Sequence, residues 1–292
     1  MSRNEIKREL IKLMKSIVDR FPKLAMTYRY MRDSWQIYEE PEMTPLGFKF
    51  IGNRSMQEGK FEPEETKIVK KLIPHVDVVI NVGANIGYYS CIALSHGKYV
   101  VAFEPINLNY RYLLKNIRAN NWESQIEVFP LALSNKVGIV EIYGGETGAS
   151  LVKGWAGTPE YYVTLVSSST LDNVLGSRSQ VKKYFIIVDI EGAEFLMLQG
   201  SSSFIDRNPK PIWMIEISIS EHQPKGISIN PNVLSTFKIF WDKGYEAWTA
   251  DKQCRLVRPD EIENIVKSGK DTLLTHNFLF IEQGKKNELM YA

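Results

Sequence analysis

Two glycines and an acid, placed at the ends of two apolar runs, have the spacing of a nucleoside site. The stretch NVGANIG (81–87) follows the run DVVI, and Gly83 and Gly87 allow a sharp turn from a strand into a helix with free N–H groups. Glu104 ends the next run, YVVAFEP, where a carboxylate can accept hydrogen bonds from both hydroxyls of a ribose. The pattern predicts a bound nucleoside that Gly83, Gly87 and Glu104 surround.

The type of nucleotide depends on the middle of the glycine turn. A dinucleotide fingerprint reads G-x-G-x-x-G, and Asn85 stands at the middle glycine position. This weakens the interpretation as a nicotinamide-dependent oxidoreductase, which is kept as an alternative. A second alternative is a protein that holds a nucleoside without catalysing a reaction.

A second group of acids follows later runs. In VDIEGAE, Asp189 stands at the carboxyl end of a predicted buried strand, where ligands bind in open α/β sheets. Asp189 is therefore a candidate general base, a role that contributes about 10²–10⁴-fold. Glu191 is either a second candidate base or a partner for the N-terminus of the next helix. Glu216 ends the following strand, and with Asp189 it could hold Mg²⁺.

Short strand-like runs alternate with helical stretches over most of the chain. The alternation predicts an α/β fold with a mainly parallel sheet and helices on both faces. The expected strands are 77–82, 99–103, 126–129, 184–189, 212–217, 244–249 and 277–281, and the expected helices are 62–72, 88–95, 107–120, 193–199 and 233–243.

One region breaks this rhythm. Residues 137–143 and 161–167 predict two extra strands that enclose a glycine-rich loop. We find no internal repeat, so residues 46–292 are expected to form one domain and residues 1–45 a helical extension.

The extension carries the basic character of the chain. Residues 1–32 hold nine Lys/Arg and three Asp/Glu, a net charge of +6 within a total of +2. The segment predicts a basic amphipathic helix that packs on the main domain, packs on a second subunit, or lies on an anionic membrane surface. Its apolar stripe is Ile6, Leu10, Leu13, Ile17 and Phe21.

Composition excludes several other classes of protein. The overall charge gives no argument for a nucleic-acid partner. Two cysteines, Cys91 and Cys254, indicate neither a disulfide framework nor a structural zinc site. No membrane span or signal peptide is evident, so a cytoplasmic location is expected.

From about Gly59 to its end, the chain resembles the FkbM-type S-adenosylmethionine-dependent methyltransferases. The resemblance implies a Rossmann-like class I methyltransferase fold with a seven-stranded sheet whose last strand is antiparallel. It also implies that Gly83, Asn85 and Gly87 border the methionine part of S-adenosylmethionine, that Glu104 holds the ribose, and that Ala132 faces the adenine. The motifs that carry it are GKFEPEET, VINVGANIGYYS, AFEP, PLALS, STLDNVL, VDIEGAEFLMLQG, PIWMIEI and NFLF.

The chain departs from this family at two positions. The family usually has an acid where Asn81 stands, and a lysine where Ile187 stands. We hypothesise that the two charges form a cross-strand ion pair in relatives, because losing one alone costs roughly 3–5 kcal/mol whereas losing both can be nearly neutral. Asn81 is also a candidate to bind the amino-acid end of the ligand.

The resemblance implies an S-adenosylmethionine-dependent methyltransferase. We expect O-methylation of a hydroxyl on a sugar, glycan, lipid or secondary metabolite, because a positioned carboxylate such as Asp189 can take the proton that makes a hydroxyl a poor nucleophile.

Overall fold

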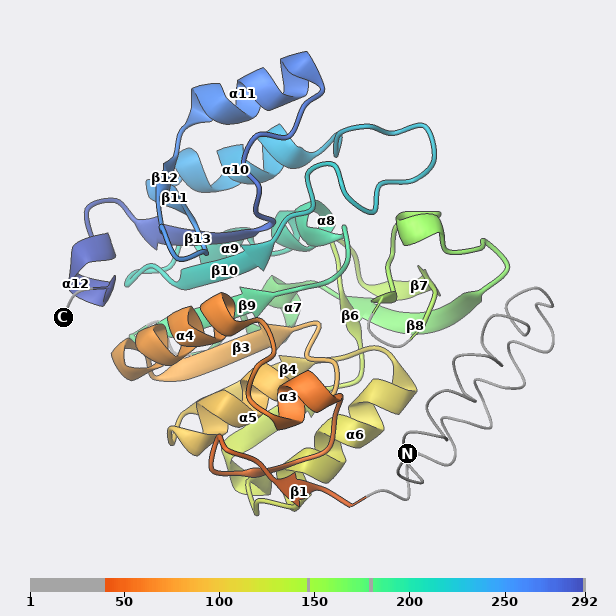
Figure 1. Ribbon diagram of the computed structural model, residues 1–292, viewed down its shortest axis with the longest axis vertical. Coiled ribbons are helices and arrows are strands. Elements are labelled where there is room, and N and C mark those ends of the chain that lie inside the picture. Colours follow the sequence, from red (N-terminus) through yellow and green to blue (C-terminus); the bar gives the residue numbers. More distant parts are fainter. Residues whose placement is uncertain (1–39, 146–147, 179–180, 291–292) are drawn as a thin grey trace, which may run out of the picture. The chain divides into compact units, whose positions relative to one another are not determined.

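The computed structural model describes residues 40–290, apart from 146–147 and 179–180 (Figure 1). The predicted N-terminal helix and its apolar stripe lie outside the described residues. The compact unit begins at Glu42, where the short strand β1 (Glu42–Met43) pairs with β2 (Lys49–Phe50).

The central sheet has eight strands in the order β12-β11-β13-β10-β9-β3-β4-β5. The five strands from β10 to β5 are parallel, and the last strand of the chain, β13, is antiparallel to both its neighbours, as predicted. The seven predicted strands are all present, and the eighth strand is β12, a two-residue edge strand. The bounds are β3 Val78–Val82, β4 Tyr99–Phe103, β5 Ile126–Phe129, β9 Tyr184–Val188, β10 Ile212–Glu216, β11 Tyr245–Thr249, β12 Leu256–Val257 and β13 Asn277–Glu282.

Helices cover both faces of this sheet, because alternate residues of its strands are buried in two separate apolar clusters (Figure 1). In the described part of the chain, no helix is both long and apolar enough to cross a bilayer. One face carries α7 (Leu171–Leu175), α8 (Glu194–Gln199), α9 (Ser202–Ile205), α10 (Val233–Trp241) and α11 (Pro259–Ser268). The other carries α3 (Arg54–Gln57), α4 (Pro63–Leu72), α5 (Tyr88–Ser95), α6 (Asn107–Arg118) and α12 (Lys286–Met290).

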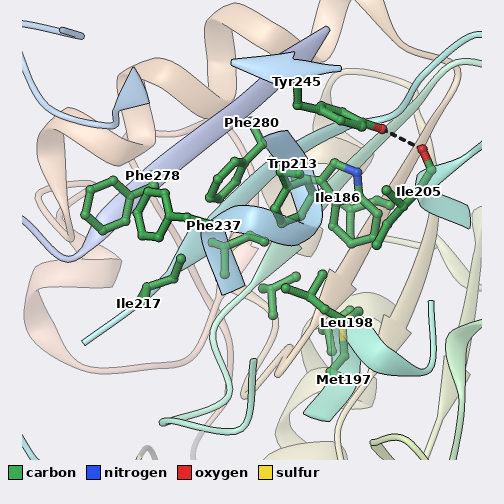
Figure 2. Packing of buried hydrophobic residues seen from close by; sticks show 14 of the residues in the cluster. Ile186, Met197, Leu198, Ile205, Trp213, Ile217, Phe237, Tyr245, Phe278 and Phe280 are labelled. Atoms are coloured by element: carbon green, nitrogen blue, oxygen red, sulfur yellow. Dashed lines mark hydrogen bonds between the residues drawn. The ribbon is translucent and has the colours of Figure 1, made fainter. Parts of the chain in front are cut away.

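An aromatic core fixes strands β9 and β10 from the α10 side (Figure 2). Trp213 of β10 meets Phe240 edge to face, and Phe240 stacks on Phe280 with ring centroids 4.0 Å apart. The hydroxyl of Tyr245 donates to the carbonyl of Ile205 at 3.0 Å, which ties β11 to α9 (Figure 2). This packing sets the positions of the strand ends that carry the acids predicted for the site.

The two predicted extra strands are present and belong to a separate small sheet, ordered β6-β8-β7. β6 is Ala132–Leu133, β7 is Gly138–Tyr143 and β8 is Val163–Ser169. The segment that joins β7 to β8 contains a short 3-10 helix, Trp155–Gly157, drawn in light green in Figure 1. We call its described residues 148–162 the β7–β8 connection.

Candidate functional site

A pocket of about 570 Å³, including its open mouth, lies at the carboxyl ends of β3, β4 and β9. This is where open α/β sheets bind ligands. The pocket brings together six residues predicted for the site: Gly83, Asn85, Glu104, Ala132, Asp189 and Glu191.

The other two predicted cofactor residues do not line this pocket. Asn81 is 3% exposed, and its side-chain amide donates to the Ser90 hydroxyl of α5 at 2.9 Å. Gly87 is the N-cap of α5 and has a φ of 93°. A side chain at position 87 would meet the Leu113 side chain at 2.3 Å, so this glycine allows α5 and α6 to approach each other.

The N–H groups of the glycine turn are all used in hydrogen bonds within the protein. All five N–H groups from 83 to 87 donate within the protein, so none is free for a phosphate oxygen. The acceptors lie at 2.8–3.0 Å: the Phe103 carbonyl for Gly83 and Ala84, the Glu104 carboxylate for Asn85, the Asn85 side chain for Ile86, and the Ala84 carbonyl for Gly87.

Gly83 also joins the two motifs of the site. Its φ is 76°, and a Cβ at this position would lie 1.8 Å from the carbonyl oxygen of Asp189. The Asp189 N–H donates to the Val82 carbonyl at 3.1 Å. Only glycine permits this approach, which places the turn after β3 against the end of β9.

Glu104 is a buried carboxylate, 3% exposed, held by three donors. Its Oε2 accepts from the Asn85 N–H, and its Oε1 accepts from the Ile106 N–H, both at 2.8 Å, and from the Asn109 side chain at 3.2 Å. Burial raises the pKa of Glu104 to about 7, against the opposing effect of these hydrogen bonds. The carboxylate is fixed in one orientation at the pocket wall.

Apolar side chains form the wall next to Glu104. Phe103 stacks on Phe129 with ring centroids 5.2 Å apart, and Ala132 begins β6 at this wall. Such a wall suits a flat aromatic base. Its apolar members are Phe103, Leu131, Ala132, Leu133, Ile142, Ala149 and Leu151.

Asp189 follows β9, and Glu216 is the last residue of the adjacent parallel strand β10. Val188 and Ile215 are register partners, so the two acids leave the sheet side by side. Within the described residues, no donor reaches either carboxylate. Burial is the main cause that raises the pKa of both groups, and repulsion from neighbouring carboxylates is the second. One of these neighbours is Glu62, at the N-cap of α4.

The remaining acids near Asp189 have defined partners. The carboxylate of Glu194 accepts from the Gly192 N–H at 3.0 Å at the start of α8, and burial raises its pKa to about 7. Glu191 accepts from the indole N–H of Trp155 at 2.8 Å. Glu194, rather than Glu191, therefore supports the helix N-terminus.

The carboxylates do not combine into a metal centre. Over residues 40–290, leaving aside the four internal residues not described, no three His, Cys, Asp or Glu side chains are grouped to hold an ion. The pairing of Asp189 with Glu216 supplies two carboxylate groups, one fewer than the three side chains of such a group.

Asn81 and Ile187 are direct register partners on β3 and β9. Their neighbours Val79 and Phe185 belong to the same apolar cluster, so both side chains face the α5 side of the sheet. This is the geometry that the ion-pair hypothesis requires. The chain fills the two positions with neutral side chains.

Sequence reasoning missed Asn109 and Trp155. Asn109 is a buried polar residue in the first turn of α6, five residues after Glu104, and this placement on the pocket side of a helix was a usable signal. Trp155 stands alone in a glycine-rich stretch, where nothing local indicates that it reaches Glu191 across 36 residues.

Among solved structures, three chains illustrate the similarity. Precorrin-6y C5,15-methyltransferase from Geobacter metallireducens GS-15 has a TM-score of 0.39 at 8% identity, covering 79% of this chain and 92% of that one. StiE O-MT has a TM-score of 0.39 at 9% identity, covering 78% of this chain and 77% of that one. TYW2 from P. horikoshii, in complex with MeSAdo, has a TM-score of 0.38 at 12% identity, covering 80% of this chain and 67% of that one.

Similarity at this level carries no argument about chemistry. A search of curated proteins found no match. The assignment rests on the Methyltransferase FkbM domain, which matches residues 81–247, more than half of the chain. This range contains the glycine turn, Glu104 and the VDIEGAE motif, and the mixed α/β sheet is the class I methyltransferase fold expected from them. The chain belongs to the FkbM methyltransferase family.

Proposed function

We propose that the protein transfers a methyl group from S-adenosylmethionine to a hydroxyl oxygen, with Asp189 as the general base. The observation that carries the proposal is that one pocket holds both Glu104 and Asp189. The first carboxylate is fixed by donors, and the second has none among the described residues.

The residues around the pocket fit S-adenosylmethionine. Glu104 would accept from the ribose hydroxyls, and the apolar wall at Ala132 would take the adenine. The acidic side at Asp189 and Glu191 suits a cationic amino group and sulfonium. A nicotinamide dinucleotide fits less well, because its pyrophosphate would find no free N–H group in the turn from 83 to 87.

When bound, S-adenosylmethionine supplies a methyl group on a positively charged sulfur. The task of the protein is to align the acceptor oxygen and to take its proton. Asp189 and Glu216 stand side by side, so like-charge repulsion keeps one of them protonated and leaves the other as a base. Asp189 is the one of the two that lines the pocket.

The charge at this end also limits the acceptor. Because one of Asp189 and Glu216 stays protonated, the pair carries one negative charge beside Glu191, and that charge repels phosphates and other anions. We therefore propose an uncharged hydroxyl acceptor, such as a sugar, glycan, lipid or secondary metabolite, and no nucleic acid.

Calorimetric titration with S-adenosylhomocysteine and with NAD tests the ligand, and transfer of a labelled methyl group to a panel of neutral glycosides and glycans tests the reaction. We expect S-adenosylhomocysteine to bind, NAD not to bind, and label to appear in a neutral acceptor. Binding of NAD alone would support the oxidoreductase alternative. Binding without transfer to any acceptor class would support the nucleoside-binding alternative.

A further inference from the structure

The β7–β8 connection meets the VDIEGAE loop through Trp155. This side chain is 2% exposed, although it lies in a surface connection. Its indole N–H donates to the carboxylate of Glu191 at 2.8 Å. A charged acceptor makes this hydrogen bond stronger than one between neutral groups.

The indole ring also fills the space above Gly192. A Cβ at position 192 would lie 2.5 Å from the ring of Trp155, and Gly192 has a φ of 92°. The glycine of this motif is therefore required by the close approach of Trp155 as well as by its own backbone conformation.

Ser150 makes a second attachment between the same two segments. Its hydroxyl donates to the backbone carbonyl of Glu191 and accepts from the Val152 N–H at 2.9 Å. Glu191 itself has a φ of 55°, a left-handed backbone conformation that residues other than glycine adopt at a cost in free energy. Both polar ends of this strained residue are thus held by the β7–β8 connection.

The attachment matters for the pocket because the connection is one of its walls. Ala149 and Leu151 line the pocket on either side of Ser150. On the other side of Trp155, the Ala156 N–H donates to the carbonyl of His222 at 2.7 Å, so a third loop is joined to the same point.

We propose that Trp155 is a positioning residue: its hydrogen bond to Glu191 holds the β7–β8 connection in place as a wall of the cofactor pocket. The proposal rests on the proposed function in one respect, that the pocket binds S-adenosylmethionine or S-adenosylhomocysteine. It assigns a role to a part of the chain that contributes no catalytic group.

The direct test compares Trp155→Phe with wild type and with Glu191→Ala. Phenylalanine keeps an aromatic ring against Gly192 and removes the N–H donor. We expect each variant to release S-adenosylhomocysteine about tenfold faster in a displacement assay, as loss of one charge-assisted hydrogen bond implies. Trp241→Phe, outside the pocket and packed on Phe237, is the matched control and should leave the rate unchanged.

The double variant separates positioning from general packing. If Trp155 acts through Glu191, then Trp155→Phe adds nothing in a Glu191→Ala background. Equal and additive effects of the two substitutions would show that Trp155 only packs, and would overturn the proposal. An unchanged release rate in Trp155→Phe would overturn it as well.

A measurement without any ligand keeps this test separate from the proposed function. Lys153 lies two residues before Trp155 with its side chain 55% exposed, so trypsin can report how firmly the connection is held. We expect Trp155→Phe and Glu191→Ala to be cut after Lys153 about tenfold faster than wild type, because local opening governs cleavage. Cutting after Lys252, an exposed lysine in the turn that follows β11, should be unchanged. If wild type fails to bind S-adenosylhomocysteine, the proposed function falls while this result still decides the positioning role. Equal rates at Lys153 would overturn it.

Discussion

The two ends of the pocket treat a carboxylate in opposite ways. At one end, Glu104 is buried and accepts three hydrogen bonds, two of them from backbone N–H groups. At the other end, Asp189 and Glu216 have no donor among the described residues, and they face further acids. Burial raises the pKa of Glu104 and of both acids at the other end, but only Glu104 has donors that favour its charged form.

Under the proposed function, this difference separates a binding group from a reacting group. A carboxylate fixed by backbone donors keeps one orientation, which suits the recognition of two hydroxyl groups. A carboxylate without donors gains most from taking up a proton, which suits a base. Inward from the pocket, Asn81 of β3 and Ile187 of β9 are register partners, and neither side chain is charged.

Asn81→Asp is expected to have the largest effect, on stability. The new carboxylate would be buried between β3 and α5 without a cation, at a cost of roughly 3–5 kcal/mol in the free energy of unfolding. Urea denaturation followed by circular dichroism measures this cost. A stable Asn81→Asp protein would show that charge is tolerated inside the sheet and would remove the contrast with the strand ends.

The matched control is the double variant Asn81→Asp with Ile187→Lys. Because the two positions are register partners facing one side, the pair should recover most of the stability that either single substitution loses. Additive losses in the double variant would contradict the ion-pair hypothesis for these positions.

Asp189→Asn is expected to have the next largest effect, on turnover. The amide keeps the size of the side chain but cannot take a proton, so methyl transfer should fall at least about a hundredfold. Affinity for S-adenosylhomocysteine, measured separately by calorimetry, should stay close to that of wild type. If turnover falls only in proportion to affinity, Asp189 is a binding residue and Glu191 becomes the next candidate base.

Glu104→Ala tests the opposite end of the pocket. A charged acceptor of hydroxyl groups is worth about 1.5–3 kcal/mol, so affinity for S-adenosylhomocysteine should weaken by roughly tenfold to over a hundredfold. Thermal unfolding of the same variant checks that the fold is intact. Unchanged affinity would remove Glu104 from the cofactor site.

Much of the fold could be predicted because its signals are local. The helix predicted at 88–95 matches α5, Tyr88–Ser95, and the strands before Gly83, Glu104 and Asp189 lie within one residue of their predicted bounds. Edge strand β12 and helix α11 were not predicted. β12 has two residues, too few to show an alternating pattern, and its existence depends on pairing with β11.

Candidate site residues could be predicted from the sequence where they lie at strand ends, and could not be predicted where they depend on tertiary contacts. Parallel strands bring their carboxyl ends to one edge, so Glu104 and Asp189 could be placed at one pocket from order alone. Whether a carboxylate has donors is decided by residues such as Asn109, whose contact with Glu104 depends on how α6 packs. Trp155 reaches Glu191 only through the folded β7–β8 connection.

The smallest expected effect is a dependence of affinity on pH. In the proposed complex, ribose hydroxyls would donate to the ionised form of Glu104, and burial raises the pKa of this group to about 7. Affinity for S-adenosylhomocysteine should therefore rise with pH, by roughly tenfold between pH 6 and 7.5. Stability has the opposite sign. The folded protein binds this proton more tightly than the unfolded chain, so the contribution of Glu104 to the free energy of unfolding is present at low pH and is lost as the pH rises towards 7.

The variant Glu104→Gln isolates both slopes, because burial also raises the pKa of Glu194, near Asp189, to about 7. Glutamine keeps an acceptor oxygen and has no proton to lose in this range, so its affinity should be lower than that of wild type at pH 7.5 and nearly independent of pH. The difference in unfolding free energy between wild type and variant should change with pH between about 4.5 and 7. If Glu104→Gln keeps the full pH dependence of affinity, the titrating group lies at the Asp189 end, and the two ends of the pocket differ less than their hydrogen bonds imply.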